Sequence, residues 1–570
     1  MSKINFFAIS GMDEKARACY VLEIDKSIYV INCGVENPIV ETLGVSKIVP
    51  DVSYLVNNKD RIKAILIGTA TMSNIGALDF LIEKIGTNAP IITSEVSKTV
   101  IQTFLANKYK IQNQIDKIQF IEANAMRDLI LDNDQCIVPF KIVNSMPNSL
   151  GFVFRTPDGC IIYLDDYIIC NDQSKAFYSQ LANIRDIINR QPVLLLITKT
   201  GIVDKSKHFT SPFHNNKEFF ENILANTSNR VIIALHDHDA YSVFSVAQAA
   251  KKYQKHFIIY SKSFINVFQA TIKADLFSNR GLLSLPISEL NTEKNTVIVI
   301  TGEPEKLFNK IHKILDEEDD KLQFQQNDTF VLGTKLIPGY EGLGSKLLDK
   351  ISKFDIKTIT MPKTILPLEP SNEDHKFTAS LIQPKYIIPI SGLYKSFAQY
   401  AEVINETWLK KNQVLILSNG EVASFENGEL ESIKQKFNFE LVPMSAFGSS
   451  DITSSVLYER NQMAENGTFL ISFIVNANNE IISDLDMHDY GLINHNDDKA
   501  MQVLNKLKND IKNNIYTFFV YKNGKTIDFK ETKTLIKKGI TKLFDKSLNK
   551  RPIVLPTIVE GKDENTARSK

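Results

Sequence analysis

Short, continuously apolar runs that alternate with helix-like segments restrict the possible folds of this chain more than any other sequence feature. Continuous apolar character is typical of strands that are buried on both faces. Two intervening segments, Asn74–Ile85 and Glu95–Ala106, have helical spacing. The pattern predicts layered sheets covered by helices. The predicted strands of the first 200 residues are Ser27–Asn32, Ala64–Gly68, Ala89–Thr93, Gly151–Arg155, Cys160–Leu164 and Val193–Thr198.

The alternation continues through the middle of the chain and changes near residue 429. Residues 429–440 are polar and predict a linker. A C-terminal unit follows, with a predicted strand at Thr468–Val475 and a Lys-rich helical pair between residues 498 and 549. The polar tail from residue 561 to residue 570 is expected to fray. The other predicted elements are strands Val231–Leu235, His256–Tyr260, Thr296–Thr301, Tyr386–Ile390 and Val414–Leu417, and helices Tyr241–Tyr253 and Pro304–Glu318.

Composition narrows the class of protein. A chain of 570 residues predicts about three or four domains. The 66 Lys and Arg residues balance the 66 Asp and Glu residues, which excludes a globally basic nucleic-acid coat but not a local basic patch. We find no apolar run of the ~18 residues that a transmembrane helix needs. Five cysteines without a CxxC pair, and no export signal, favour a reduced, cytoplasmic protein.

The search for catalytic motifs finds only weak signals. HExxH, CxxC, Walker A and GxSxG patterns are absent. His236-Asp237-His238 has a possible metal-ligand spacing, but two ligands make no closed site, so a polar loop is favoured. Gly302-Glu303-Pro304 lies between a predicted strand and a predicted helix, where the free N–H groups of a helix start often bind phosphate. One glycine is a weak signal, so a simple turn without a ligand is favoured. The segment Lys522–Arg551 has ten Lys or Arg and three Asp or Glu residues. It is either the solvated face of an amphipathic helix, which is favoured, or a surface that contacts RNA phosphates or an acidic partner.

The order of several segments resembles the ribonuclease J family, the β-CASP branch of the metallo-β-lactamase superfamily. The resemblance runs nearly the full length of the chain. Ser371-Asn372-Glu373-Asp374 also matches the family's S-Q-E-D, which supports the alignment there. The segments that carry the resemblance are Phe7–Gly34, Leu43–Leu55, Arg61–Ala77, Asn144–Asp172, Gln383–Tyr394 and Lys550–Glu560.

The resemblance implies an α/β fold in three parts. A metallo-β-lactamase αββα sandwich would comprise residues 1–198 and 358–428. A β-CASP α/β domain, residues 199–357, would be inserted into it. After a linker at residues 429–441, a small α+β domain of residues 442–560 would serve oligomerisation, and residues 561–570 would form a flexible tail.

The resemblance also implies where metal ligands should lie. Family enzymes hold two metal ions with histidines and aspartates, and the metals activate a water that attacks the phosphodiester. Only the bridging aspartate is retained, as Asp166, while the aspartate of an early turn is Asn32. Thr, Ser and Asn are weak zinc ligands, so we expect no metal or cofactor, or at most one hydrated Mg²⁺ on Asp166 and Asp165. Capping of a turn is an equal alternative for Asp166. The other ligand positions carry Thr69, Thr71, Ser73, Asn74, Asn144 and Ser391.

The family's RNA-binding segments are altered too. The first acidic β-CASP position carries Lys199, and the HASGH segment reads Ile365–Glu369. The phosphate-side TGSQGEP is shortened to Thr301–Pro304. By resemblance, the candidates for RNA contact are Thr301, Gly302, Glu369 and Ser371.

These features predict a ribonuclease J-like protein of RNA decay and processing that is a pseudoenzyme. It would bind RNA weakly or through a partner. Through its C-terminal domain it would associate with an active ribonuclease J paralogue or with itself, as the second and poorly active copy of such a pair. One alternative is an active 5′-to-3′ exonuclease or endonuclease that uses zinc, magnesium or manganese in a site rebuilt around Asp165, Asp166, His236 and His238. The other is a scaffold without RNA binding.

Overall fold

The structure, a computed structural model, divides into two compact units. One comprises Met1–Ile39 and Lys47–Val442, the other Val40–Ser46 and Pro443–Lys570. The structure describes residues 2–38, 44–108, 112–131, 135–170, 174–203, 205–336, 339–354, 356–407, 413–445, 454–522 and 526–561. Within these ranges, no helix combines the length and the apolar character needed to cross a membrane.

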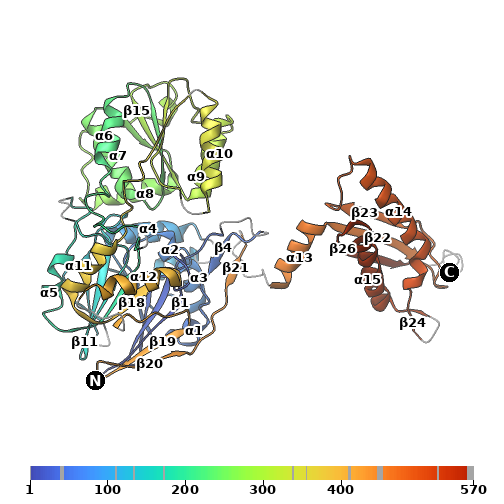
Figure 1. Cartoon of the computed structure of the whole chain (residues 1–570), viewed down its shortest axis with the longest axis horizontal. Helices are drawn as coiled ribbons and strands as arrows, with labels where there is room; N and C mark the ends of the chain where they lie inside the picture. Colours follow the sequence, from blue (N-terminus) through green and yellow to red (C-terminus); the bar gives the residue numbers. More distant parts are fainter. Residues whose placement is uncertain are drawn as a thin grey trace. The chain divides into compact units, whose positions relative to one another are not determined.

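Two facing sheets form the lower part of the first unit in Figure 1. In the described residues the first sheet has eight strands in the order β20-β19-β1-β2-β3-β5-β6-β7. Its central strands β2 and β3 are fully buried, and β3 lies where the sequence predicts the strand Ser27–Asn32. The bounds are β1 Lys3–Ser10, β2 Cys19–Ile24, β3 Ser27–Ile31, β5 Ile62–Ile67, β6 Ile91–Thr93, β7 Phe120–Glu122, β19 Glu421–Glu426 and β20 Glu429–Gln435.

The second sheet has six described strands in the order β18-β12-β11-β10-β9-β8. Phe6, Tyr20 and Leu66 of the first sheet share one core with Phe152 and Ile161 of the second, so this core lies between the sheets. The bounds are β8 Leu129–Ile130, β9 Cys136–Lys141, β10 Leu150–Thr156, β11 Gly159–Leu164, β12 Val193–Lys199 and β18 Pro384–Ile390.

Helices cover the outer faces of both sheets. Residues of α5, α11 and α12 pack on the outer face of the second sheet, and α1 to α4 lie beside the first (Figure 1). The αββα sandwich expected from the resemblance is therefore confirmed. The bounds are α1 Ser53–Asn57, α2 Met72–Ile75, α3 Leu78–Ile85, α4 Glu95–Ala106, α5 Ile184–Ile187, α11 Asn372–Ile382 and α12 Tyr394–Asn405, with short 3₁₀ turns at Lys59–Arg61, Gln112–Lys117 and Leu181–Asn183.

An α/β domain is inserted between β12 and β18. Its described strands are all parallel and follow the order β14-β15-β13-β16-β17. Helices α6 to α8 cover one face of this sheet and α9 and α10 the other, and α8 packs against α4 of the sandwich. The bounds are β13 Val231–His236, β14 His256–Ile259, β15 Thr296–Gly302, β16 Thr329–Leu332, β17 Lys357–Thr360, α6 Lys217–Ala225, α7 Ala240–Lys252, α8 Lys262–Lys273, a 3₁₀ turn at Ile287–Glu289, α9 Pro304–Leu315 and α10 Glu341–Ser352.

The C-terminal unit has a three-stranded sheet in the order β23-β22-β26, with β22 and β26 parallel. One face of the sheet packs on α14 and α15, where Phe469 meets Phe544 with ring centroids 4.9 Å apart. The bounds are α13 Ser454–Asn466, β22 Thr468–Val475, β23 Asp486–Tyr490, α14 Asp498–Asn514, a 3₁₀ turn at Ile515–Phe518, β24 Tyr521–Lys522, β25 Thr526–Ile527, α15 Phe529–Leu548 and β26 Ile553–Glu560. Two further short strands are β4 Lys47–Val49 and β21 Val442–Met444.

Two predictions about secondary structure are wrong. Residues 429–435 of the predicted linker form β20, which pairs with β19. As an edge strand with exposed and half-buried residues, β20 has a polar composition. Val414–Leu417 forms no strand beyond an isolated bridge between Val414 and Ile387. The predicted tail, apart from Gly561, lies outside the described residues, and the domain boundaries stay predictions.

Candidate functional site

The positions at which the resemblance places metal ligands gather at one edge of the sandwich, where strands end. Thr69 follows β5, Asn144 follows β9, and Asp165 and Asp166 follow β11. Strands β11, β12 and β18 run parallel in register, with Leu164 beside Thr198 and Lys199 beside Ile390. Because parallel strands end at the same edge, their terminal side chains meet there.

Lys199, the last residue of β12, occupies the centre of this edge. Its Nζ atom forms ion pairs with Oδ1 of Asp165 and, at 3.0 Å, with Oδ2 of Asp166. The Lys199 and Asp165 side chains are almost completely buried, whereas that of Asp166 is 32% exposed. One ammonium group therefore bridges the retained aspartate and its neighbour.

Asp165 rather than Asp166 is the more constrained carboxylate. Besides the bond from Lys199, it accepts hydrogen bonds from Nδ2 of Asn74 at 2.6 Å and from the backbone N–H of Asp166 at 2.9 Å. The same Nδ2 of Asn74 donates to the carbonyl of Thr69 at 3.0 Å. The turn-capping role considered for Asp166 thus falls to Asp165.

Asn144 lies beside this cluster and uses its whole side chain in local hydrogen bonds. Its Nδ2 donates to Oγ1 of Thr69 at 2.9 Å and to the carbonyl of Asp166 at 3.1 Å. Its Oδ1 accepts from the N–H of Met146 at 2.9 Å and from the hydroxyl of Ser149 at 2.8 Å. A primary amide has two donors and two acceptor lone pairs, so none is left for a ligand.

The remaining ligand positions make other contacts. Thr71 and Ser73 form a hydrogen bond of 2.9 Å with each other. Ser391 has a left-handed backbone, with φ of 57°, and its hydroxyl donates to the carbonyl of Lys15 at 2.9 Å. Asn32, also left-handed, donates from Nδ2 to the hydroxyl of Tyr163 at 2.8 Å. Within the part of the chain that the structure describes, these bonds do not involve Asp165 or Asp166.

The protonation of the cluster follows from its surroundings. Loss of water around the carboxyl group raises the pKa of Asp166 to about 6, against the lowering effect of Lys199, and the charges of Glu369 and Asp165 raise it further. Burial alone would lower the pKa of Lys199, but the carboxylates of Asp165 and Asp166 outweigh it and raise that pKa. Lys199 is therefore a permanent cation at neutral pH.

The inserted domain brings a second group of predicted residues close to the first. His236 ends β13 beside Gly302, the last residue of β15. The rings of His236 and His238 stack with centroids 5.2 Å apart. Burial, followed by His238, lowers the pKa of His236 to about 4. Burial lowers the pKa of His238 as well, the charge of Glu303 opposes this, and the positive charge of Lys199 adds to the lowering.

The four candidates for RNA contact differ in their environments. Thr301 is buried and Gly302 packs closely against the start of α9. The negative charge of Glu369 contributes to the raised pKa of Asp166, and the Glu369 carbonyl accepts a hydrogen bond from Oγ1 of Thr210 at 2.7 Å. Ser371 is fully buried and its hydroxyl donates to Oδ2 of Asp374 at 2.8 Å in the capping box of α11, so it presents no atom to solvent.

Sequence reasoning placed Lys199 at a substituted β-CASP position but missed its bonds to Asp165 and Asp166. One signal could have found them. Lys199 ends the fully buried strand VLLLITK. Asp165 and Asp166 directly follow Leu164, the last residue of the fully buried strand before it. A lysine at the end of such a strand needs a partner of opposite charge, and the parallel neighbour supplies two.

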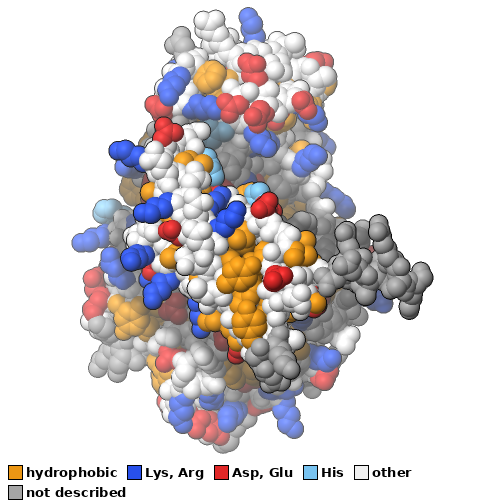
Figure 2. Space-filling model, turned by 90° about the vertical axis from the view of Figure 1, so that its right-hand side faces the viewer, with side chains coloured by type: hydrophobic (Ala, Val, Ile, Leu, Met, Phe, Trp, Pro, Cys, Tyr) orange, Lys and Arg blue, Asp and Glu red, His pale blue; other side chains and the backbone are white. Residues whose placement is uncertain are grey.

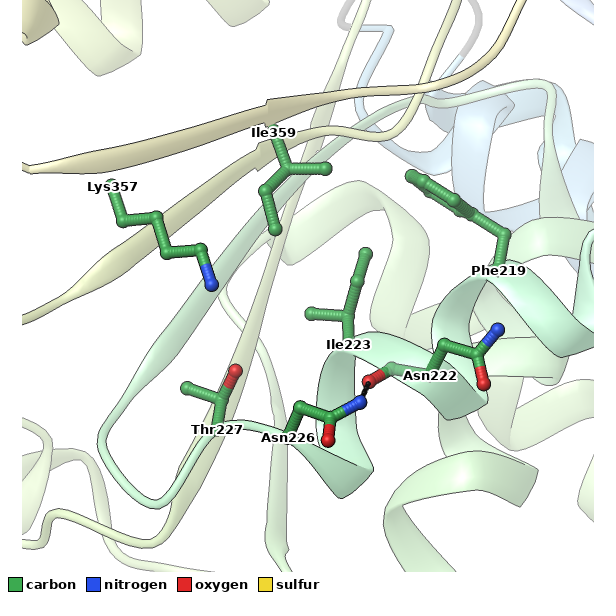
Figure 3. A pocket seen from close by; sticks show the side chains of 7 residues that line it. All are labelled: Phe219, Asn222, Ile223, Asn226, Thr227, Lys357 and Ile359. Atoms are coloured by element: carbon green, nitrogen blue, oxygen red, sulfur yellow. Dashed lines mark hydrogen bonds between the residues drawn. The ribbon is translucent and has the colours of Figure 1, made fainter.

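A pocket of about 240 Å³ lies elsewhere, between α6 and β17 of the inserted domain (Figure 3). The side chains that line it are mainly apolar groups and amides. Nδ2 of Asn226 donates to the carbonyl of Asn222 at 2.8 Å. Lys357 is the one ionisable side chain among its lining residues. It offers no constellation comparable with the one around Lys199.

Comparison with family models identifies two parts of the chain. Residues 228–351 match the model described as "Ribonuclease J, beta-CASP domain", and residues 455–561 match that of the "Ribonuclease J C-terminal domain". These ranges fall in the inserted domain and in the C-terminal unit.

Relatives extend the similarity to nearly the whole chain. An uncharacterised protein of Mycoplasma genitalium is 36% identical over 566 residues, covering 98% of this chain and 100% of the relative. Its homologue in Mycoplasma pneumoniae is 35% identical over 567 residues, with the same coverage. Ribonuclease J2 of Bacillus subtilis is 26% identical over 480 residues, covering 82% of this chain and 83% of the relative.

Proposed function

Because the chain belongs to the ribonuclease J family, a family of RNA processing and decay, we propose that it is a non-catalytic member of that family. In this proposal it acts in the cytoplasm, binds RNA and serves as a partner subunit of an active ribonuclease J. The single observation that carries the proposal is the ammonium group of Lys199 between Asp165 and Asp166.

A pair of divalent cations does not fit the residues present. The positive charge of Lys199 already satisfies both carboxylates, and a cation placed there would be repelled by it. Asn144 has no free lone pair, and Asn74 points its amide N–H groups at Asp165 and Thr69. Without two metals, the chain lacks the groups that activate a water and stabilise the leaving oxygen.

The proposal is tested by metal content and cleavage together. We expect mass spectrometry of the purified full chain to find no stoichiometric zinc, manganese or magnesium. We also expect no cleavage of a 5′-monophosphorylated RNA with added Mn²⁺ or Mg²⁺, beside an active ribonuclease J as positive control. Asp166→Ala should change neither result. Two metals per chain, with cleavage that disappears in Asp166→Ala, would falsify the proposal and establish a rebuilt site that includes His236 or His238.

We propose further that the outer face of the C-terminal sheet joins this chain to an active ribonuclease J or to a second copy of itself. On β22 and β26 the residues Leu470 and Leu555 lie side by side, as do Ile474 and Val559. Leu555, Ile474 and Val559 are exposed. The opposite face of the sheet packs on helices α14 and α15. Figure 2 shows one face of the molecule, on which apolar side chains gather among charged and polar ones. Such a face is suited to association.

Light scattering with size-exclusion chromatography tests this pairing. We expect the full chain to elute at twice its mass, alone or mixed with an active ribonuclease J. Leu555→Glu with Val559→Glu should yield the monomer without a change in circular dichroism, because a carboxylate at each position must be buried without a partner. Tyr521→Glu, at an exposed residue of β24 in the same unit, is the matched control. A parent chain that elutes as a monomer under both conditions would contradict the pairing.

A further inference from the structure

Helix α15 carries six lysines, Lys530, Lys533, Lys537, Lys538, Lys542 and Lys546, which we call the lysine face. Lys533 is half-buried and the other five are exposed. Among the described residues, none of the six forms an ion pair, whereas Asp545 of the same helix is paired with Arg551 at 3.0 Å. The lysine face is thus a concentration of positive charge that the residues described by the structure leave without ion-pair partners.

The buried side of α15 explains why this charge is held in place. Thr532, Ile536, Ile540 and Phe544 recur every four residues and pack into the core of the unit. The exposed positions of the helix include five of the six lysines. Three lysine pairs, 533 with 537, 538 with 542 and 542 with 546, stand four residues apart, where like charges destabilise a helix by a few tenths of a kcal/mol per pair. A bound polyanion removes that repulsion.

Acidic and basic residues are also separated along the sequence of the C-terminal unit. Between residues 461 and 498 there are seven Asp or Glu residues and no Lys or Arg, while residues 499–551 hold fourteen Lys or Arg and four Asp or Glu. The acidic stretch includes β22 and β23, and the basic stretch includes α14 and α15, which pack side by side. The unit is therefore polarised, with its positive potential on the helix layer.

We infer that the lysine face binds the phosphodiester backbone of RNA. A cluster of unpaired ammonium groups around the exposed part of a helix is complementary to a chain of phosphates, and it binds by releasing counterions without reading the bases. The inference deepens the proposed function, because it gives RNA a binding surface on the C-terminal unit that is separate from the edge around Lys199. RNA would then be held by a chain that does not cleave it.

Fluorescence anisotropy with a labelled single-stranded RNA of mixed sequence tests the inference on the full chain. The variant Lys537→Gln, Lys538→Gln, Lys542→Gln and Lys546→Gln removes four charges at exposed positions, and glutamine preserves helix propensity. We expect at least a tenfold weaker affinity at moderate salt. The slope of log affinity against log salt should become shallower by roughly 3, which corresponds to about 0.7 per lost contact with a single strand.

A matched control removes four exposed lysines from α9, α10 and the residue after α10: Lys306, Lys313, Lys346 and Lys353, each changed to glutamine. We expect the control to keep the affinity and slope of the parent within about twofold. Equal loss in both variants would overturn the inference, since net charge alone would then explain binding. Unchanged affinity in the α15 variant would also overturn it, as would a parent that binds anionic lipid vesicles but no RNA. The metal and cleavage results test the proposed function separately from all of these outcomes.

Discussion

Lys199→Met is expected to lower the free energy of unfolding of the first unit by about 3–5 kcal/mol, because it leaves a buried carboxylate without its counter-charge. Asp165 is 1% exposed, so water cannot replace the ammonium group. Methionine has nearly the length of lysine, which keeps the change in packing small. Urea denaturation followed by circular dichroism at pH 7 measures the loss.

Lys353→Met is the matched control for this measurement. Its ammonium group also pairs with a carboxylate, that of Asp349 at 2.9 Å, but the Lys353 side chain is 71% exposed. An exposed pair contributes between about 0 and 1 kcal/mol. The double variant Lys199→Met, Asp165→Asn should recover part of the loss, since the amide carries no charge. If Lys199→Met and Lys353→Met cost the same, Lys199 does not stabilise the site.

Arg230→Met is expected to destabilise the inserted domain by a similar amount, about 3–5 kcal/mol. Arg230 stands just before β13 and pairs through two nitrogens with Asp328, at 2.9 and 2.5 Å, just before the neighbouring β16. It also donates to the carbonyls of Leu290 and Gln323 at 2.7 and 2.8 Å. Methionine leaves the buried Asp328 carboxylate without its counter-charge and with only the N–H of Gln325, at 2.8 Å, as a donor. The carbonyls of Leu290 and Gln323 lose the guanidinium donor as well.

Hydrogen exchange followed by mass spectrometry localises this effect. Amides of β13 and β16 should lose protection, while those of β2 and β3 in the sandwich should keep it. Arg230→Lys should also be costly, because an ammonium group cannot reproduce the paired geometry of the guanidinium. Arg551→Met is the control, since Arg551 pairs with Asp545 at 3.0 Å but is 69% exposed. Unchanged protection of β13 and β16 in Arg230→Met would show that Arg230 does not join these strands.

The sequence predicts buried elements well and surface elements poorly, for a physical reason. Helix Glu95–Ala106 is found with the predicted bounds, and the all-apolar strand Val193–Thr198 gains only Lys199. Their patterns reflect burial, which local periodicity records. β20, by contrast, is held by hydrogen bonds to β19 along one edge, and its side chains are exposed or half-buried. Nothing in its composition distinguishes it from a polar linker.

For the candidate site, too, one part could be predicted from the sequence and another could not. Its position could be predicted, because the ligand positions in the resembling segments follow strands β5, β9, β11 and β18 at the same edge. The pairing of Lys199 with Asp165 could not, because the partners are 34 residues apart and no periodicity relates them. Ser371 shows the opposite failure: the matching motif suggested RNA contact, but its hydroxyl is used in the cap of α11.

The positive charge between Asp165 and Asp166 belongs to the chain itself, and this sets its thermodynamics apart from those of a dissociable ion. A bound ion stabilises a fold by mass action, in proportion to the logarithm of its concentration over its dissociation constant. A tethered ammonium group has no dissociation constant and is present at unit occupancy as soon as β12 takes its place beside β11. If the proposed function holds, we expect the folded population around this site not to vary with the supply of divalent metal ions.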